Sequence, residues 1–315
     1  MLTRSPQSPP EPHAPQREHT SRWHGVELRD EFAWLRAANW QEVMRNPDAL
    51  DPEIRAYLVA ENAYADAVLA DTAELQAALF GEMKGRIKED DSSVPTPDGP
   101  YAYFSRHREG GEHPLICRKP RDGEGEEILL DGDALAQGKA FFQLDGTRHS
   151  PDHRYLAWSA DEAGSEFNTL RVRNLATGAE LSDVLPDVSG APVWTADAAA
   201  FYYVRLDPQH RPTQVFRHKL GTAASEDVLV FEAGEPGFFV SVSEVQSGRF
   251  AVISMHDHET SECRLIDLSA PDAVPTLVAA RETGVQYDIE HHPALDGEPS
   301  LVIRTNADGA EDFKI

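Results

Sequence analysis

Residues 101–104, Tyr101-Ala-Tyr-Phe, are the first copy of a hydrophobic strand core that recurs along the chain. The other copies are Tyr155-Leu-Ala-Trp, Phe201-Tyr-Tyr-Val, Phe250-Ala-Val-Ile and Leu301-Val-Ile-Arg, at intervals of 54, 46, 49 and 51 residues. Each copy follows a turn-like stretch and precedes a second apolar segment by 12 to 15 residues. A period near fifty with several short strands per unit predicts a β-propeller, in which each unit is one four-stranded blade.

Further strand segments fill each repeat. Because one small twisted sheet cannot bury both of its faces alone, neighbouring blades must cover them. We therefore expect a mainly β fold over 91–315, a partial propeller of four complete blades and part of a fifth that stops at Ile315. The second strands are expected at Leu115-Ile-Cys-Arg, Leu170-Arg-Val-Arg, Val215-Phe-Arg-His, Arg264-Leu-Ile-Asp and Phe313-Lys-Ile, and the third strands at Glu127-Ile-Leu-Leu, Asp183-Val-Leu, Val228-Leu-Val-Phe and Thr276-Leu-Val, with a fourth beginning the next unit, as at Phe238-Phe-Val-Ser-Val.

The residues before the repeats have a different texture. Residues 1–22 hold five of the 22 prolines among polar residues and are predicted to form an extended arm without secondary structure. Residues 23–90 form an expected helical segment, with a short helix over 39–45 and a longer helical pattern that starts at Asp51 as N-cap and Pro52 as first helical residue. Asp71 and Thr72 are suitable caps for a second helix, so one long helix and two shorter ones both fit the pattern up to about Arg86.

Composition and charge exclude several classes of protein. With 29 Lys and Arg against 54 Asp and Glu, the formal net charge of −25 excludes a generic nucleic-acid binder. No apolar run is long enough for a membrane span, and the first ten residues lack the apolar region of a secretory signal, so we expect a cytoplasmic protein. Two cysteines far apart, Cys117 and Cys263, fit buried free thiols better than a disulfide framework or a metal site.

An ordered series of further motifs runs along the chain: His24-Gly-Val-Glu-Leu-Arg-Asp-Glu-Phe-Ala-Trp-Leu-Arg, Asn39-Trp40, Leu50-Asp-Pro-Glu-Ile-Arg-Ala-Tyr-Leu, Glu61-Asn-Ala-Tyr, Glu82-Met-Lys-Gly-Arg-Ile-Lys-Glu-Asp-Asp-Ser-Ser-Val-Pro, Gly99-Pro-Tyr-Ala-Tyr and Ser150-Pro-Asp-His-Arg-Tyr-Leu-Ala-Trp-Ser. This series resembles the oligopeptidase B branch of the prolyl oligopeptidase family of serine peptidases, and the resemblance extends from about Pro9 to the last residue. It implies a seven-bladed propeller that caps an α/β-hydrolase domain, with N-terminal helices that pack on the hydrolase domain.

The resemblance implies an endopeptidase that cleaves short peptides after Arg or Lys, with the propeller gating access to the hydrolase domain. The family's Ser, Asp and His triad is expected beyond Ile315, so this chain alone is expected to be inactive and to contribute no catalytic residue. The substrate-binding residues stay unassigned, and we expect no metal site, no cofactor, and no nucleic-acid or membrane partner. The alternative is a non-catalytic propeller that acts as a peptide-binding or scaffold module.

The residues of this chain agree with a catalytic triad that lies beyond Ile315. No G-x-S-x-G nucleophile elbow occurs, and Ser254, two residues from His256, is the nearest imitation of a nucleophile with a base. The stretch His256-Asp-His-Glu259 fits a metal site or a polar hairpin in blade four, and we favour the hairpin. His291-His292 is interpreted as a loop pair rather than a metal site.

Three other features have simple structural interpretations. The run Lys88-Glu-Asp-Asp-Ser-Ser is expected to be a solvated linker, with a hinge as the functional alternative. Asp131-Gly-Asp133 lacks the further oxygen ligands of a calcium loop and is expected to be a turn. Trp34 and Trp40 are expected to be core anchors rather than ligand-stacking residues.

Overall fold

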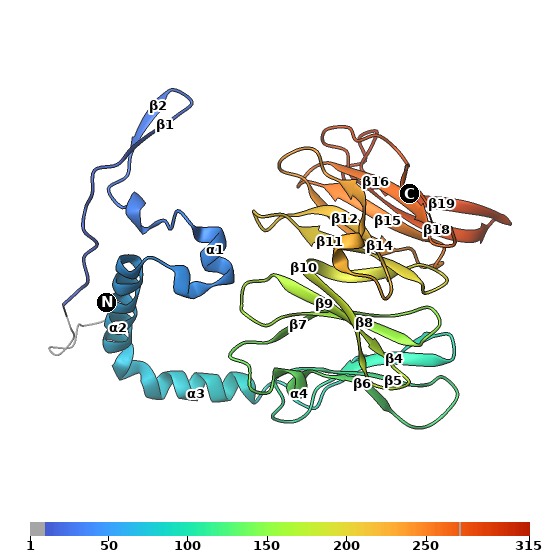
Figure 1. Ribbon diagram of the computed structural model, residues 1–315, viewed down its shortest axis with the longest axis horizontal. Helices are drawn as coiled ribbons and strands as arrows, with labels where there is room; N and C mark the ends of the chain where they lie inside the picture. The colour runs from blue at the N-terminus through green and yellow to red at the C-terminus, as the bar shows by residue number, and fades with distance from the viewer. Residues whose placement is uncertain (1–9, 271) are drawn as a thin grey trace. The chain divides into compact units, whose positions relative to one another are not determined.

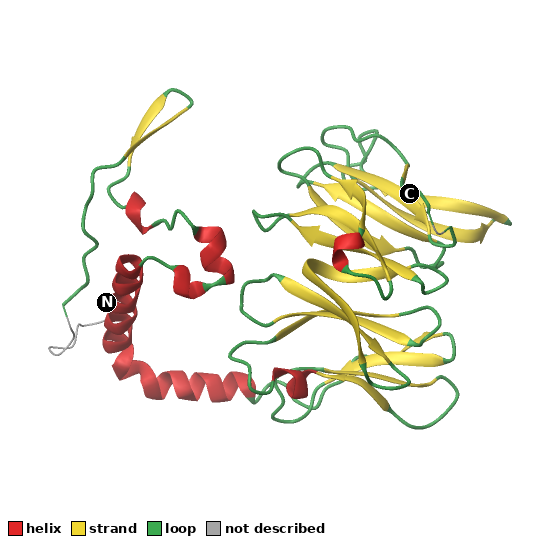
Figure 2. Ribbon diagram, in the orientation of Figure 1, coloured by secondary structure: helices red, strands yellow, loops and turns green. Residues whose placement is uncertain are grey.

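The structure is a computed structural model that describes residues 10–270 and 272–315. The chain divides into two compact units, Met1–Asp90 and Asp91–Ile315. Helices dominate the first unit and strands dominate the second, as Figure 2 shows. Residues 1–9, the first part of the expected arm, lie outside the described residues.

Residues 10–19 of the first unit form no helix or strand, and a hairpin follows them. Its first strand takes in residues 20–22, to which we assigned no secondary structure, because they pair with a second strand three residues further on. The elements of this unit are β1 (Thr20–Trp23), β2 (Val26–Arg29), η1 (Ala33–Leu35), α1 (Trp40–Arg45), η2 (Pro47–Ala49), α2 (Pro52–Leu69), η3 (Ala70–Thr72) and α3 (Ala73–Lys84).

Two helices, not one, follow Asp51. The Asp51 carboxylate accepts a hydrogen bond from the backbone N–H of Glu53 at 2.8 Å, and Pro52 occupies the first turn, as predicted. The 3₁₀ turn η3 separates α2 from α3, and Thr72 is the N-cap of α3 without a side-chain capping bond. No helix in the described part of the chain has the length and apolar content needed to cross a membrane.

The second unit consists of antiparallel blades in chain order (Figure 1). Four blades have four strands each and the fifth has two, which confirms the predicted partial propeller. The strands are β3 (Thr96–Asp98), β4 (Tyr101–Arg106), β5 (Leu115–Pro120) and β6 (Glu127–Asp131) in blade 1; β7 (Gln143–His149), β8 (Tyr155–Asp161), β9 (Asn168–Asn174) and the first part of β10 (Glu180–Trp194) in blade 2; the rest of β10, β11 (Ala200–Leu206), β12 (Pro212–Lys219) and β13 (Val228–Glu232) in blade 3; β14 (Phe239–Glu244), β15 (Phe250–His256), β16 (Ser261–Asp267) and β17 (Thr276–Leu277) in blade 4; and β18 (Tyr287–Leu295) and β19 (Glu298–Thr305) in blade 5.

The strand cores that begin at residues 155, 201 and 250 are apolar at every position because these strands pack on both faces. Successive side chains of a strand point to opposite sides of the sheet. In β11, Phe201 and Tyr203 pack into the core shared with blade 2, whereas Tyr202 and Val204 pack into the core shared with blade 4. Similar cores lie between blades 1 and 2 and between blades 4 and 5, so four apolar layers hold the five blades together.

Blades 2 and 3 share one strand. The first part of β10 pairs with β9 and its last part pairs with β11. Val188 pairs with both strands, and a bulge between Ser189 and Val193 interrupts the pairing with β11. The predicted third strand at Asp183-Val-Leu is therefore continuous with the first strand of the next blade. The predicted strand at Phe313-Lys-Ile is wrong, because only a single bridge joins Thr305 and Lys314.

A hydroxyl group organises the turn before two of the repeated strands. Ser150 Oγ accepts a hydrogen bond from the backbone N–H of Tyr155 at 3.0 Å and donates to Asp152 Oδ1 at 2.6 Å. Thr195 Oγ1 makes the equivalent bonds to the N–H of Ala200 and to Asp197, at 3.0 and 2.7 Å. These hydrogen bonds fix the turns that precede β8 and β11, and so fix where the two strands begin.

Candidate functional site

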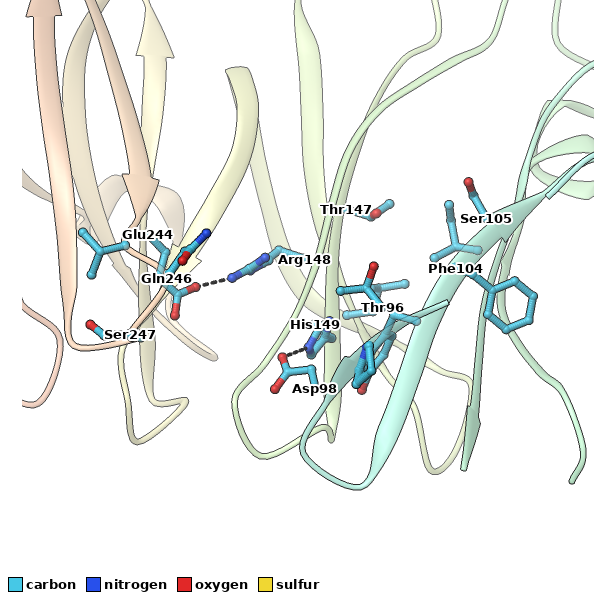
Figure 3. A pocket seen from close by; sticks show the side chains of 16 residues that line it. Thr96, Asp98, Phe104, Ser105, Thr147, Arg148, His149, Glu244, Gln246 and Ser247 are labelled. Carbon is cyan, nitrogen blue, oxygen red and sulfur yellow. Dashed lines mark hydrogen bonds and ion pairs between the residues drawn. The ribbon is translucent and has the colours of Figure 1, made fainter. Parts of the chain in front are cut away.

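A pocket of about 690 Å³ in the second unit is lined by residues from the first strands of blades 1, 2 and 4. Residues of β3, β4 and β7 form one side, and the end of β14 with the turn over 244–248 forms the other. The strand β10 contacts both β7 and β14, so the first strands of blades 2, 3 and 4 are neighbours. Figure 3 shows this pocket, which we call the rim pocket.

Two charged or polar pairs cross the rim pocket. Arg148 on β7 forms an ion pair with Glu244 on β14, which joins blade 2 to blade 4 (Figure 3). His149 Nε2 lies 2.7 Å from Asp98 Oδ2, which joins blade 2 to blade 1. Because successive residues of β7 point to opposite sides, Arg148 and His149 reach different blades.

An aromatic stack supports His149. The rings of Tyr103 and His149 are parallel within 2°, with centroids 3.6 Å apart, and the Tyr103 hydroxyl lies 2.8 Å from His153 Nδ1. Burial raises the pKa of Tyr103 to about 12, so its hydroxyl stays protonated at neutral pH. Burial also lowers the pKa of His149, and it outweighs the opposing effect of the Asp98 carboxylate. His149 is therefore a neutral ring at pH 7, and its Nε2–H donates to Asp98.

A second pocket, of about 720 Å³, lies toward the other end of β7, where it is lined by Gln143 and Asp145. It is acidic: Asp145, Asp161 and Glu166 line it, and the described lining residues include no Lys or Arg. The Asp161 carboxylate is buried and accepts the backbone N–H groups of Ala163, Gly164 and Glu166, whereas the Glu166 side chain is exposed. We call it the acidic pocket, and its charge suits a cationic ligand group.

The nearest imitation of a catalytic pair has no catalytic geometry. Ser254 Oγ contacts Cys263 Sγ at 3.8 Å, while His256 Nδ1 lies 3.3 Å from the Asp257 carbonyl oxygen. The stretch from His256 to Glu259 connects β15 to β16, so the favoured hairpin interpretation is confirmed. Asp257 caps this turn by accepting the N–H groups of Glu259 and Thr260.

Two of the predicted turns or loops are wrong. His291 and His292 lie within β18, where they pair with Leu301 and Ser300, because the hairpin of blade 5 extends further than its apolar core. Asp131 ends β6 and caps the short helix α4 (Gly132–Ala136), accepting the N–H of Ala134 at 3.0 Å. The second carboxylate of that stretch, Asp133, accepts the N–H groups of Glu112 and His113.

The predicted core anchors of the first unit are only half buried. Trp34 Nε1 donates to the Pro15 carbonyl oxygen at 2.8 Å, and its ring packs edge-on against Tyr57. Trp40 begins α1 and belongs to no buried cluster among the described residues. Trp34 thus ties the N-terminal segment to α2 rather than filling a central core.

The acidic run after the helices has no helix or strand over 88–91. It lies at the division between the two units, between Asp90 and Asp91. Just beyond it, Ser92 bridges to Arg106 and Ser93 Oγ accepts the N–H of Ser105. The end of the run is therefore fixed to blade 1.

Both cysteines are buried free thiols, as expected. Burial raises the pKa of Cys117 to about 11, so it is not a reactive thiolate at neutral pH. Within residues 10–270 and 272–315, no group of three or more His, Cys, Asp and Glu side chains is arranged to hold a metal ion. Sequence reasoning missed Asp98, Arg148 and Glu244, whose only signal is their position at the end of a strand next to a turn.

Comparison with known proteins agrees with this architecture. Residues 12–315 match the family described as "Prolyl oligopeptidase, N-terminal beta-propeller domain". Dipeptidyl aminopeptidase BI of Pseudoxanthomonas mexicana is 36% identical over 310 residues, which cover 93% of this chain and 41% of that protein. Protease 2 of Moraxella lacunata is 29% identical, over 94% of this chain and 42% of its own length.

Solved structures with the same architecture include oligopeptidase B from Leishmania major, with a TM-score of 0.87 and 28% identity over 98% of this chain and 44% of that chain. Oligopeptidase B from Trypanosoma brucei has a TM-score of 0.84 and 29% identity, over 97% and 44% of the two chains. The chain thus spans less than half the length of these relatives. It belongs to the prolyl oligopeptidase family of serine peptidases and carries the N-terminal β-propeller of that family.

Proposed function

We propose that this chain is the N-terminal and propeller part of a serine endopeptidase of the oligopeptidase B type, which cleaves short peptides after Arg or Lys. The propeller gates access to a C-terminal α/β-hydrolase domain, and the Ser, Asp and His of the triad lie in that domain, beyond Ile315. The helical segment 23–90 packs on the same domain. The observation that carries the proposal is the similarity to oligopeptidase B over 98% of the chain.

The acidic pocket supports the preference for basic peptides. Three acidic residues line it, no Lys or Arg is among the described lining residues, and the chain as a whole carries a formal charge of −25. Such a field raises the local concentration of cationic peptides and speeds their encounter, and salt screens it. The two buried free thiols support a reducing compartment, and we propose the cytoplasm.

The test must distinguish the proposed endopeptidase from two alternative functions. One relative is named dipeptidyl aminopeptidase, so release of dipeptides from a free amino terminus is the competing peptidase activity. A propeller that binds peptides or scaffolds other proteins without chemistry is the competing non-catalytic function.

The experiment compares the 315-residue chain with the same chain extended by the coding sequence that follows residue 315 in its gene. Both are assayed on an amino-blocked dibasic fluorogenic peptide and on an unblocked dipeptide amide, at low and high salt. We expect turnover of the blocked peptide by the extended protein alone, with kcat/KM falling as salt rises. Turnover by the short chain overturns the placement of the triad, preference for the unblocked dipeptide overturns endopeptidase specificity, and binding without turnover by the extended protein favours the non-catalytic module.

A further inference from the structure

Polar contacts connect the five blades along the rim pocket. Blade 1 meets blade 2 through Asp98 and His149. Blade 3 meets blade 2 where Trp194 Nε1 donates to the Arg148 carbonyl oxygen at 3.1 Å. Blade 5 meets blade 4 where the N–H of Gln246 donates to Glu290 Oε2 at 3.0 Å and Ser247 Oγ lies 2.8 Å from His291 Nδ1. Each of these contacts joins neighbouring blades, which a packed apolar core already holds together.

The ion pair between Arg148 and Glu244 is different, because it joins blades 2 and 4 across blade 3. The two apolar cores on either side of blade 3 fix each neighbour against it. The distance between blades 2 and 4 at the rim pocket therefore depends on the angle between those two interfaces. A small change in either interface changes the separation of β7 and β14, and the ion pair opposes that change directly.

Both ends of the ion pair are anchored. The backbone of Arg148 is held by Trp194 from blade 3 and, in β7, by pairing with Ala157. The backbone of Glu244 pairs with Ala251 in β15, two residues before the contact between Gln246 and Glu290. Widening of the rim pocket on this side therefore requires the ion pair itself to break. The side chains are 42% and 23% exposed, so dissolved salt reaches and screens the pair.

We propose that the Arg148–Glu244 ion pair is a salt-sensitive brace that holds blades 2 and 4 together across blade 3 and limits the width of the passage at the rim pocket. This inference rests on the proposed function, because it names the device that restricts long peptides in a gating propeller. When the brace is closed, the pocket admits short segments only. When it is broken by salt or mutation, the first strands separate and longer peptides pass.

The first test uses the 315-residue chain and needs no enzymatic activity. Arg148→Glu and Glu244→Arg each place like charges opposite one another, and the double variant restores an opposite pair. We expect each single variant to speed amide hydrogen exchange at the ends of β7 and β14 by about threefold, a change of the size expected for a partly exposed ion pair. The double variant and wild type should match each other, and high salt should speed exchange in both.

Two further variants make the result specific. Glu244→Gln removes the attraction without adding repulsion, so it serves if a charge reversal prevents folding. Arg304→Glu breaks the exposed pair with Asp288 inside the hairpin of blade 5 and should leave β7 and β14 unchanged. The brace is overturned if the exchange rates at the ends of β7 and β14 are unchanged in both charge reversals and in Glu244→Gln. It is also overturned if the double variant exchanges as fast as the single variants.

The second test uses the extended protein described above. We expect Glu244→Gln to raise kcat/KM for a peptide of about thirty residues relative to kcat/KM for a four-residue peptide. An inactive wild-type extended protein would overturn the proposed function, and the exchange experiment would still decide the brace. An active enzyme whose length preference ignores the variant and salt would overturn the brace and leave the proposed function standing.

Discussion

The imidazole Nε2 of His218 on blade 3 lies 2.8 Å from Asp183 Oδ1 on blade 2, and both side chains are fully buried between the two blades. Its other nitrogen, Nδ1, lies 2.6 Å from Asp227 Oδ1. The ring thus spans two buried carboxyl groups. Asp227 also accepts from the Tyr203 hydroxyl at 2.7 Å and lies 3.6 Å from Arg205, so one network joins the imidazole, both carboxyl groups and a guanidinium group.

The first prediction removes this histidine. His218→Phe keeps a ring of similar size but leaves two buried carboxylates without their main partner, and we expect a loss of about 3–5 kcal/mol in the free energy of unfolding. Urea titration followed by tryptophan fluorescence measures it. His256→Phe, at an exposed histidine of blade 4, is the control. A loss below about 1 kcal/mol, within the range of an exposed pair, would show that the network is not stabilising.

The second prediction concerns the close approach of β7 and β10. A Cβ at Gly146 would lie 2.9 Å from the backbone nitrogen of Ala191, and backbone atoms cannot move aside as a flexible side chain can. We expect Gly146→Ala to destabilise the fold by about 1–3 kcal/mol through overpacking. Gly234→Ala, where a Cβ meets nothing within 4 Å, should change the melting temperature far less. Equal effects of the two variants would contradict the close packing.

The third prediction concerns the dependence of stability on pH. Burial lowers the pKa of His149 below its unfolded value, so the unfolded chain binds a proton first as the pH falls. Because of His149, the free energy of unfolding falls as the pH drops below about 6.5, and this loss continues until the pH reaches the pKa of the folded state. His149→Phe keeps a ring on Tyr103 and removes the titration. The variant should lose less unfolding free energy than wild type between pH 7.5 and 5.5, and an equal loss would refute the assignment.

The fourth prediction tests the hydroxyl-capped turn before β11. Thr195→Val keeps the shape of the buried side chain but leaves the N–H of Ala200 and the Asp197 carboxylate without the hydroxyl, at a cost of about 1–3 kcal/mol. Thr195→Ser keeps the hydroxyl and should lose clearly less. The Thr195 hydroxyl lowers the pKa of Asp197, so part of the difference should disappear as the pH falls through that pKa. Equal thermal stability of the two variants would argue against the hydroxyl.

The fifth prediction concerns the apolar side chains of α2 and α3. Val59, Leu75, Phe80 and Met83 are each about 60% exposed, and such a stripe favours association. We expect the 315-residue chain to self-associate at micromolar concentration in sedimentation velocity, and Phe80→Asp to reduce that association. Val274→Asp, at an exposed apolar residue near the end of blade 4, is the matched control. A monomer at all concentrations would show that the stripe does not drive association.

Local features of this protein were predictable from the sequence. The strand cores at 155, 201 and 250 are apolar at every position because both of their faces are packed, and this pattern marks them without knowledge of their neighbours. The start of α2 was equally clear, since an N-cap such as Asp51 acts within three residues. Interactions of this range are encoded in the spacing of residues along the chain.

The tertiary structure alone decided which distant residues meet. Arg148 and Glu244 are 96 residues apart, and nothing in their spacing marks them as partners, because the angles between blades bring them together. The same holds for His218 between its two carboxylates, and for His291, whose place in β18 depends on pairing with β19. Local periodicity is enough to predict the repeated strands, the N-terminal helices and their caps. The packing of blade on blade decided the pockets and the ion pairs across them, because such contacts depend on the relative positions of segments far apart in the chain.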